Sequence, residues 1–66
     1  MIAFEVNDMS CGHCVRAITE AVKAADSRAD VHIDLARHRV EIEPASADAA
    51  ALASVIREAG YTPVLA

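Results

Sequence analysis

The chain is short and contains few aromatic residues. It has 66 residues, one Tyr, one Phe and no Trp. A compact fold this short buries only about 60% of the surface that its unfolded chain exposes, so we expect a single domain over residues 1–66 and no linker. Because 55% of the residues are hydrophobic, the core has to be built from Val, Ile, Leu and Ala, and disorder is not expected.

Long apolar runs are also missing. No run approaches the roughly 20 residues that a membrane-spanning helix needs. Met1 leads directly into an alternating segment, without the basic start, apolar stretch and small-residue cleavage site of a secretory signal. We therefore expect a soluble, cytoplasmic protein that does not insert into a membrane.

Positive charge is scarce. The chain has only six Lys and Arg residues, and its formal net charge is -4. No basic stripe is available to neutralise a phosphate backbone. Nucleic acid is therefore not an expected partner.

Cysteine occurs twice, at Cys11 and Cys14. Two cysteines so close together in a reducing cytosol are expected to stay as thiols and not to form a structural disulfide. The pair therefore indicates a chemical site.

Periodicity of the apolar residues predicts the elements of the first two thirds of the chain. Residues 2–6 alternate between apolar and polar, which is typical of a strand with one buried face. Apolar residues recur at helical spacing over 15–25, and this helix is expected to end near residues 26–27. Residues 31–35 and 40–42 alternate again and predict an antiparallel pair of strands.

The start of a second helix is predicted after Pro44, which ends the preceding strand. Ser46 is expected to cap this helix, and Asp48 to lie against its positive end. An apolar stripe follows over residues 52–59. The spacing of this stripe predicts a helix with one buried face.

The last residues predict the end of that helix and a final strand. Gly60 suits the left-handed residue that ends a helix, and Pro63 prevents its continuation. Residues 64–65 supply a short last strand. The resulting order predicts an α+β fold, the ferredoxin-like βαββαβ sandwich, with a four-stranded antiparallel sheet and two helices on one of its faces.

The two cysteines stand where the first strand gives way to the first helix. The first turn of a helix has free N–H groups and a positive dipole end, which favour thiolate over thiol. Two thiolates without a carboxylate or His ligand beside them favour copper(I) over zinc, which normally takes four ligands. We therefore predict that Cys11 and Cys14 bind one copper(I) ion, with room for an incoming thiolate to take it over.

The segment Met9-Ser10-Cys11-Gly12-His13-Cys14, in a chain of this length and element order, resembles the heavy-metal-associated domain of copper chaperones and copper-transporting P-type ATPases. The resemblance covers essentially the whole chain. It implies that Cys11 and Cys14 bind the metal, that Met9 is a buried support of the loop, and that Tyr61 lies near the site. It also implies a partner, the metal-binding domain of a copper-transporting ATPase. Asp8 departs from the family pattern, which often has Gly there, although Asp tolerates turn geometry better than most residues.

Two other functions fit the same cysteines. Cys-Gly-His-Cys is also the active-site tetrapeptide of disulfide isomerases, in which the His lowers the pKa of the first thiol. A thioredoxin-like domain needs more residues than this chain has, and Ser10 replaces the aromatic residue usual before the first Cys. A domain of the same fold that binds mercury(II) or zinc is the second alternative. In the preferred interpretation no covalent bond of a substrate changes, so an enzyme is not expected.

Several side chains near the motif invite a ligand role. We interpret His13 as solvent-facing, so that it tunes the thiolates and does not bind the ion. His32 and His38 are expected to be solvated. Met9 is expected to pack in the core, because its neighbours are apolar.

The sequence also suggests how the protein meets others. Arg16 and Lys23 follow the site on the first helix, and we expect them to steer an acidic partner. Without metal we expect a monomer. An exposed two-thiol site also permits a copper-bridged dimer with four shared thiolates.

Overall fold

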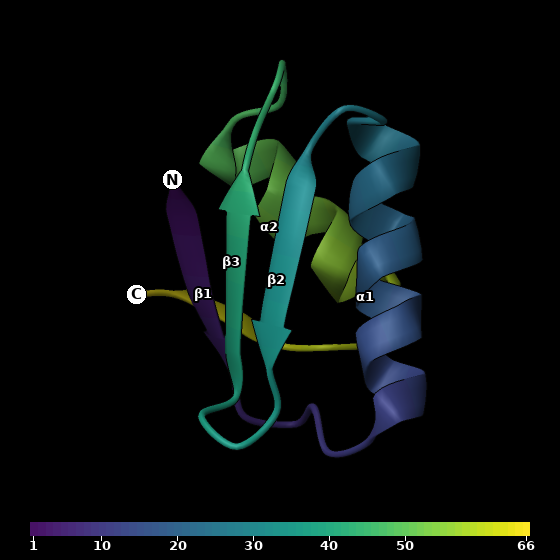
Figure 1. The fold of residues 1–66 in the computed structure, drawn as a ribbon, viewed down its shortest axis with the longest axis vertical. Helices are drawn as coiled ribbons and strands as arrows, with labels where there is room; N and C mark the ends of the chain where they lie inside the picture. Colours follow the sequence, from purple (N-terminus) through teal and green to yellow (C-terminus); the bar gives the residue numbers. More distant parts are fainter.

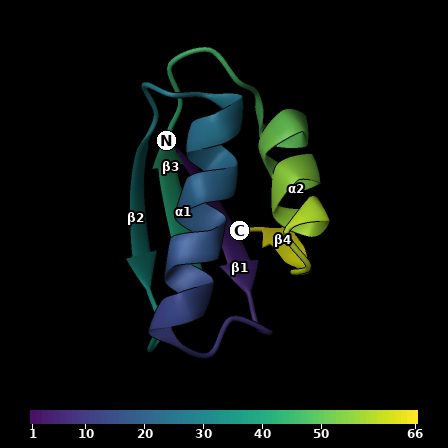
Figure 2. The same cartoon turned by 90° about the vertical axis from the view of Figure 1, so that its right-hand side faces the viewer.

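The computed structural model describes all 66 residues, and its elements follow the predicted order. These elements are β1 (Ile2–Val6), α1 (Gly12–Ala25), β2 (Asp30–Asp34), β3 (Arg39–Glu43), α2 (Ala49–Glu58) and β4 (Pro63–Leu65). The strands form one sheet in the order β2-β3-β1-β4, and every neighbouring pair is antiparallel. Both helices lie on the same side of this sheet (Figures 1 and 2). The predicted ferredoxin-like α+β sandwich is therefore confirmed.

The core lies between the sheet and the two helices. Its fully buried members come from alternate positions of the strands and from one stripe of each helix: Phe4, Val6, Val40, Ile42, Ile18, Val22, Leu52 and Ile56. Each such side chain stabilises the fold by about 1.5–3 kcal/mol when it is removed from water. No helix of the structure is both long enough and apolar enough to cross a membrane.

The strand register explains why one face of the sheet is solvated. Ile42 of the central strand β3 lies opposite Ile2 on one side and Val31 on the other, so apolar residues form a row toward the helices. One residue along, Glu41 lies opposite His32 on the outer face. Because side chains alternate between the faces, a shift of one residue would bury this polar row. The register is therefore fixed by the apolar pattern.

The prediction that Ser46 caps α2 is wrong. The N-cap is Asp48, whose side chain accepts the N–H of Ala51 at 2.9 Å. The N–H of Ser46 instead donates to Oδ2 of Asp26, at 2.8 Å. The segment before α2 is wrapped around this buried carboxylate, so the cap of the helix lies two residues later than Ser46.

The end of α2 confirms the role predicted for Gly60. This residue has a φ of 100°, a conformation that glycine adopts without steric cost. Its N–H donates to the carbonyl of Arg57 at 2.9 Å, and the N–H of Tyr61 donates to the carbonyl of Ile56 at 3.3 Å. This pair of bonds is the Schellman motif. It reverses the chain so that Tyr61 returns toward the loop between β1 and α1.

Candidate metal site

The two cysteines occupy the first turn of α1. Cys11 is its N-cap residue, and its carbonyl accepts the N–H of Cys14 at 3.0 Å and of Val15 at 3.3 Å. The first turn contains no acidic residue. Both sulfurs therefore lie at the positive end of the helix dipole without a competing carboxylate, an environment that favours thiolates.

The distance between the two sulfurs can be compared with the distance that a shared ion would require. Both cysteines are free, and their Sγ atoms are 3.6 Å apart. A disulfide has an S–S distance of about 2.05 Å. A metal with M–S bonds of about 2.3 Å has sulfurs about 3.8 Å apart at a tetrahedral angle and about 4.6 Å apart when they are collinear with it. The observed spacing therefore suits a bent two-sulfur site, and a linear one needs an opening of about 1 Å.

The two sulfurs differ in accessibility. Cys11 is exposed, whereas the side chain of Cys14 is 9% exposed and belongs to the core cluster. An exposed side chain on a loop can rotate, and a packed one in a helix cannot do so without leaving a cavity. The site therefore has one exposed and one anchored sulfur.

Hydrogen bonds hold Cys14 as a thiolate. The hydroxyl of Tyr61 donates to its sulfur, and so does the backbone N–H of Ser10. These bonds outweigh burial and lower the pKa of Cys14 from 9.0 to about 6. The same contact raises the pKa of Tyr61, because a thiolate acceptor stabilises the protonated hydroxyl. Tyr61, which the resemblance placed near the site, thus contacts a predicted ligand.

Met9 supports the loop from below, as expected. Its side chain is fully buried, and its N–H donates to the carbonyl of Val6 at 3.2 Å. Asp8, at the position where the family often has Gly, needs no left-handed backbone, since the only non-glycine residue with positive φ is His38. The Asp8 carboxylate accepts the N–H of Thr62 at 3.2 Å. The departure at Asp8 therefore adds a tie between the loop and the segment that carries Tyr61.

Two of the three histidines lie where they were expected. His13 and His32 are exposed, and no group of three His, Cys, Asp or Glu side chains is arranged to hold a metal. The prediction for His38 is wrong: it is half-buried, and its Nδ1 lies 2.8 Å from the carbonyl oxygen of Met9. Periodicity could not have found this contact, because the two residues are 29 apart in the chain.

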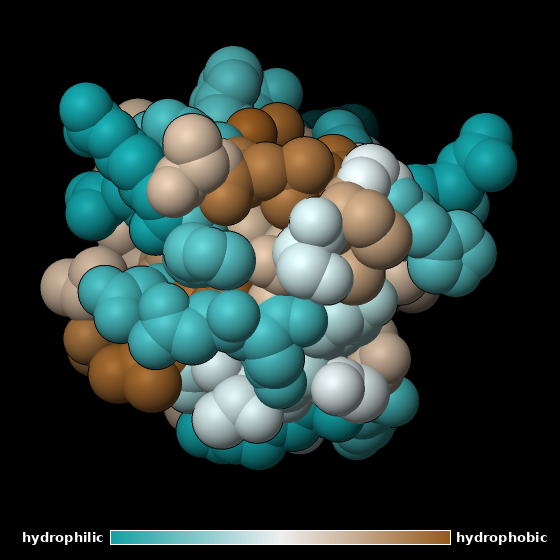
Figure 3. Space-filling model, turned by 90° about the horizontal axis from the view of Figure 1, so that it is seen from below, coloured by the Kyte–Doolittle hydropathy of each residue, from teal (hydrophilic) through white to brown (hydrophobic).

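The end of the molecule that carries the loop is mixed in polarity. Figure 3 views this end, where apolar atoms form separate groups between polar ones. This end therefore lacks the broad apolar face of a permanent interface.

A small βαββαβ domain with two free cysteines at the start of its first helix has the architecture of a metal-binding domain. Residues 3–62 match the family model described as the heavy-metal-associated domain. The chain therefore belongs to the heavy-metal-associated domain family.

The proteins to which this chain is similar include ones named for copper or gold. Copper-transporting ATPase 2 of Rhizobium meliloti (strain 1021) is 31% identical over 64 residues, which are 96% of this chain. The chain spans only 8% of the length of that ATPase. The copper chaperone Atx1 from Synechocystis PCC6803 superposes with a TM-score of 0.93 at 31% identity, over 97% of this chain and 100% of the other. A gold-binding protein superposes equally well, with a TM-score of 0.93 at 29% identity over 100% of both chains.

Proposed function

We propose that this domain carries one copper(I) ion between Cys11 and Cys14 and delivers it to a partner protein by thiolate exchange. The observation that carries the proposal is the asymmetry of the pair: two free sulfurs 3.6 Å apart, one anchored and hydrogen-bonded, the other exposed. An ion held by two sulfurs has coordination positions left for a third.

Transfer then proceeds by replacement of one sulfur at a time. A deprotonated thiol of the partner bonds to the ion first, which gives a three-sulfur intermediate. The Cys11 sulfur leaves next, since its side chain is the exposed one. A second partner thiolate replaces Cys14, and the copper stays in the +1 oxidation state throughout. The ion is never released to water, and no substrate bond is altered, so the proposal describes a carrier and not an enzyme.

The donor set supports copper(I) over other metals. Zinc normally takes four ligands, and only two sulfurs converge here, without a third His, Cys, Asp or Glu. Mercury(II) also accepts two sulfurs, so it is the alternative that the experiment below has to separate. The similar gold-binding protein indicates that this fold suits soft thiophilic ions in general.

The partner proposed is a homologous metal-binding domain of a copper-transporting P-type ATPase, which the similarity to such an ATPase supports. The proposal assumes the reducing cytoplasm, where both thiols stay free. It treats residues 1–66 as one domain, monomeric without metal, with a copper-bridged dimer as a further state.

The position of the sulfur with the lowered pKa argues against a thiol-disulfide enzyme. The nucleophile of a thiol-disulfide enzyme has to be accessible as well as deprotonated. Here the lowered pKa belongs to Cys14, which is buried against Tyr61. The arrangement therefore suits an anchored metal ligand better than an attacking thiolate.

The test is an anaerobic titration of the reduced protein against a copper(I)-specific chromogenic chelator, beside a variant with Cys11→Ser and Cys14→Ser. We expect one ion per chain in the wild type, with the variant folded and unable to compete. Zinc and mercury(II) titrations in parallel measure selectivity. Failure of the wild type to compete for copper(I) would overturn the proposal, and mercury(II) or zinc would then be the metal to test as the cargo.

A further inference from the structure

His38 occupies an unusual position in the turn between β2 and β3. Its φ is 53°, in the left-handed region that only a few per cent of residues other than glycine adopt, with Asn, Asp and His enriched among them. The residue is half-buried although it lies in a turn. A conformation of this kind persists only where the surroundings hold it, so the contacts of His38 require an explanation.

His38 bonds to both ends of the segment that leads from β1 into the cysteine loop. Its carbonyl accepts the N–H of Val6 at 2.7 Å. Its ring nitrogen Nδ1 lies 2.8 Å from the carbonyl oxygen of Met9. A carbonyl oxygen can only accept, so Nδ1 carries the proton and donates. His38 thus holds the chain where β1 ends and again two residues before Cys11.

The bond to Met9 reaches the metal site through one peptide plane. The carbonyl of Met9 and the N–H of Ser10 belong to the same peptide unit, which is planar and trans. The carbonyl accepts from His38, and the N–H on the opposite side of the plane donates to the Cys14 sulfur. A rotation of this unit that broke one bond would also misdirect the other. Accepting a hydrogen bond at the carbonyl also polarises the N–H and strengthens it as a donor.

We propose that His38 is a positioning residue of the metal loop: its Nδ1–H fixes the Met9–Ser10 peptide so that the Ser10 N–H is aimed at the Cys14 sulfur. The inference rests on the proposed function for its effect on copper(I), because Cys14 is a ligand only under that proposal. The link between His38, Met9 and Ser10 can be tested without any metal.

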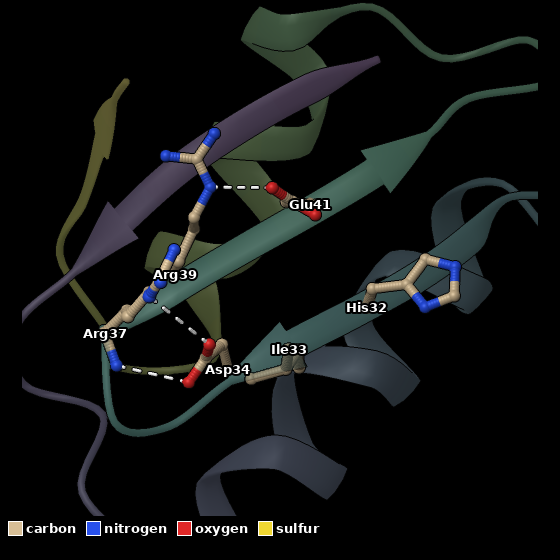
Figure 4. Close-up of a pocket in the computed structure, with 6 residues that line it drawn as sticks. All are labelled: His32, Ile33, Asp34, Arg37, Arg39 and Glu41. Atoms are coloured by element: carbon tan, nitrogen blue, oxygen red, sulfur yellow. Dashed lines mark hydrogen bonds and ion pairs between the residues drawn. The ribbon is translucent and has the colours of Figure 1, made fainter.

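The hairpin that presents His38 is itself held by polar contacts. The N–H of His38 donates to the carbonyl of Leu35 at 3.3 Å, which closes the turn. Asp34 accepts the N–H of Arg37 at 3.3 Å and lies 3.8 Å from its guanidinium. Asp34 and Arg37 are among the residues that line a hollow of about 200 Å³ on the outer face (Figure 4). The turn therefore offers His38 to the loop from a braced position.

The experiment compares His38→Gly with His38→Asn. Glycine accepts the left-handed backbone but removes the ring. Asparagine also tolerates this backbone, and its Nδ2 branches from the same Cγ position as the imidazole Nδ1, so it can donate to Met9. His32→Asn is the matched control, because His32 is an exposed histidine on β2 away from the loop.

The metal-free readout is amide hydrogen exchange followed residue by residue. We expect the Ser10 amide to exchange about tenfold faster in His38→Gly, with the core amides of Val40 and Ile42 unchanged, and to recover in His38→Asn. Equal acceleration at Ser10 and in the core, or none at Ser10, would overturn the proposal, since the first outcome describes a purely structural residue.

The metal readout is copper(I) competition on the same proteins. Loss of a residue that orients a metal ligand typically costs about 10–100-fold in affinity; acting through one peptide unit, His38→Gly is expected to lose about tenfold while His38→Asn and His32→Asn stay within about twofold. If the wild type itself fails to bind copper(I), the proposed function fails and the exchange result still decides the role of His38. If the wild type binds and His38→Gly binds equally well, the positioning role is wrong.

Discussion

The two ends of α1 each hold an anion, and they hold it in different ways. At the C-terminal end, the carboxylate of Asp26 is buried, and its Oδ2 accepts three backbone N–H groups, from residues 45–47, at 2.8 to 3.1 Å. At the N-terminal end, the sulfur of Cys14 accepts from a tyrosine hydroxyl and one N–H of the preceding loop, with the second sulfur 3.6 Å away. Figure 1 shows that the two sites lie at opposite ends of the molecule.

The difference separates an anion that completes the fold from one kept available for binding. Asp26 is surrounded by donors of its own chain, so its hydrogen bonds lock the turn before α2 and leave no position for a ligand. Cys14 is held by enough donors to remain a thiolate, yet it lies beside the exposed Cys11. The same device, hydrogen-bond donors aimed at an anion, thus builds a structural clamp at one end and the proposed metal site at the other.

The largest effect is expected from removing the charge of Asp26. In Asp26→Asn the three N–H groups lose an ionised acceptor, so the melting temperature should fall by ~10 °C. Copper(I) affinity, measured while both proteins are folded, should not change, because the substitution is at the other end of α1. Thermal melts followed by circular dichroism and the chelator competition measure the two quantities.

The dependence of the free energy of unfolding on pH, measured below about pH 4, provides the control for that substitution. The bonds to residues 45–47 lower the pKa of Asp26 from 3.8 to about 2. A group with a lowered folded pKa stabilises above its unfolded pKa, so this contribution is complete above pH 3.8 and is lost as the pH falls to about 2. Wild type and Asp26→Asn should therefore converge in stability near pH 2. Parallel curves over this range would contradict the assignment.

An intermediate effect is expected at the metal end from Tyr61→Phe, which removes the largest cause of the lowered pKa of Cys14. The pKa of Cys14 should rise from about 6 toward 9.0. The thiolate of Cys14 stabilises the fold fully above pH 9.0, and this contribution is lost as the pH falls through about 6. In Tyr61→Phe the contribution should be smaller and should be lost at a higher pH, because the folded pKa lies closer to 9.0.

Thiolate absorbance near ~240 nm, titrated against pH, measures this change directly. If the pKa rises by one unit, proton competition should weaken copper(I) binding about fivefold at pH 6 and hardly at all at pH 9. Ser54→Ala, which removes an exposed hydroxyl from α2, serves as the control. An unchanged thiolate titration in Tyr61→Phe would show that the hydroxyl does not hold the sulfur.

The fold could be predicted because local periodicity decides it. Alternation in the first three strands and the stripes of both helices defined these elements, the last strand followed from the stop signals at Gly60 and Pro63, and the Cys11–Cys14 spacing marked a thiol pair. The errors have a common physical origin. Ser46 and Asp48 are equally good caps by residue type, and only the buried Asp26, 20 residues away from Ser46, decides between them.

The candidate site shows the same limit. That Cys11 and Cys14 share a loop follows from their spacing, whereas the contact of His38 with Met9 requires the β2–β3 turn to lie beside the loop, which no local pattern specifies. Tyr61 is an instructive intermediate case, since the family resemblance placed it near the site and the Schellman turn explains how it gets there. Long-range hydrogen bonds are therefore the part that has to come from the structure.

The smallest effect concerns encounter with a partner, and it tests whether the metal end alone is built for exchange. Arg16 is highly exposed, with only a weak contact of 3.9 Å to Glu20, and Lys23 is exposed on the same helix. Reversing both charges should slow copper(I) transfer to a homologous ATPase domain about threefold at low salt, since solvent-exposed charges act mainly on the association rate.

Stopped-flow transfer measured at several salt concentrations should show the difference disappear as salt screens the charges. Arg16→Glu and Arg28→Glu change the net charge by the same amount and form the matched pair. Arg28→Glu, at the Asp26 end, should leave the rate within about twofold, because that end docks nothing in the proposed exchange. Equal slowing by Arg16→Glu and Arg28→Glu would mean that net charge, and not the position of Arg16 in the part of α1 that follows the cysteines, governs the encounter.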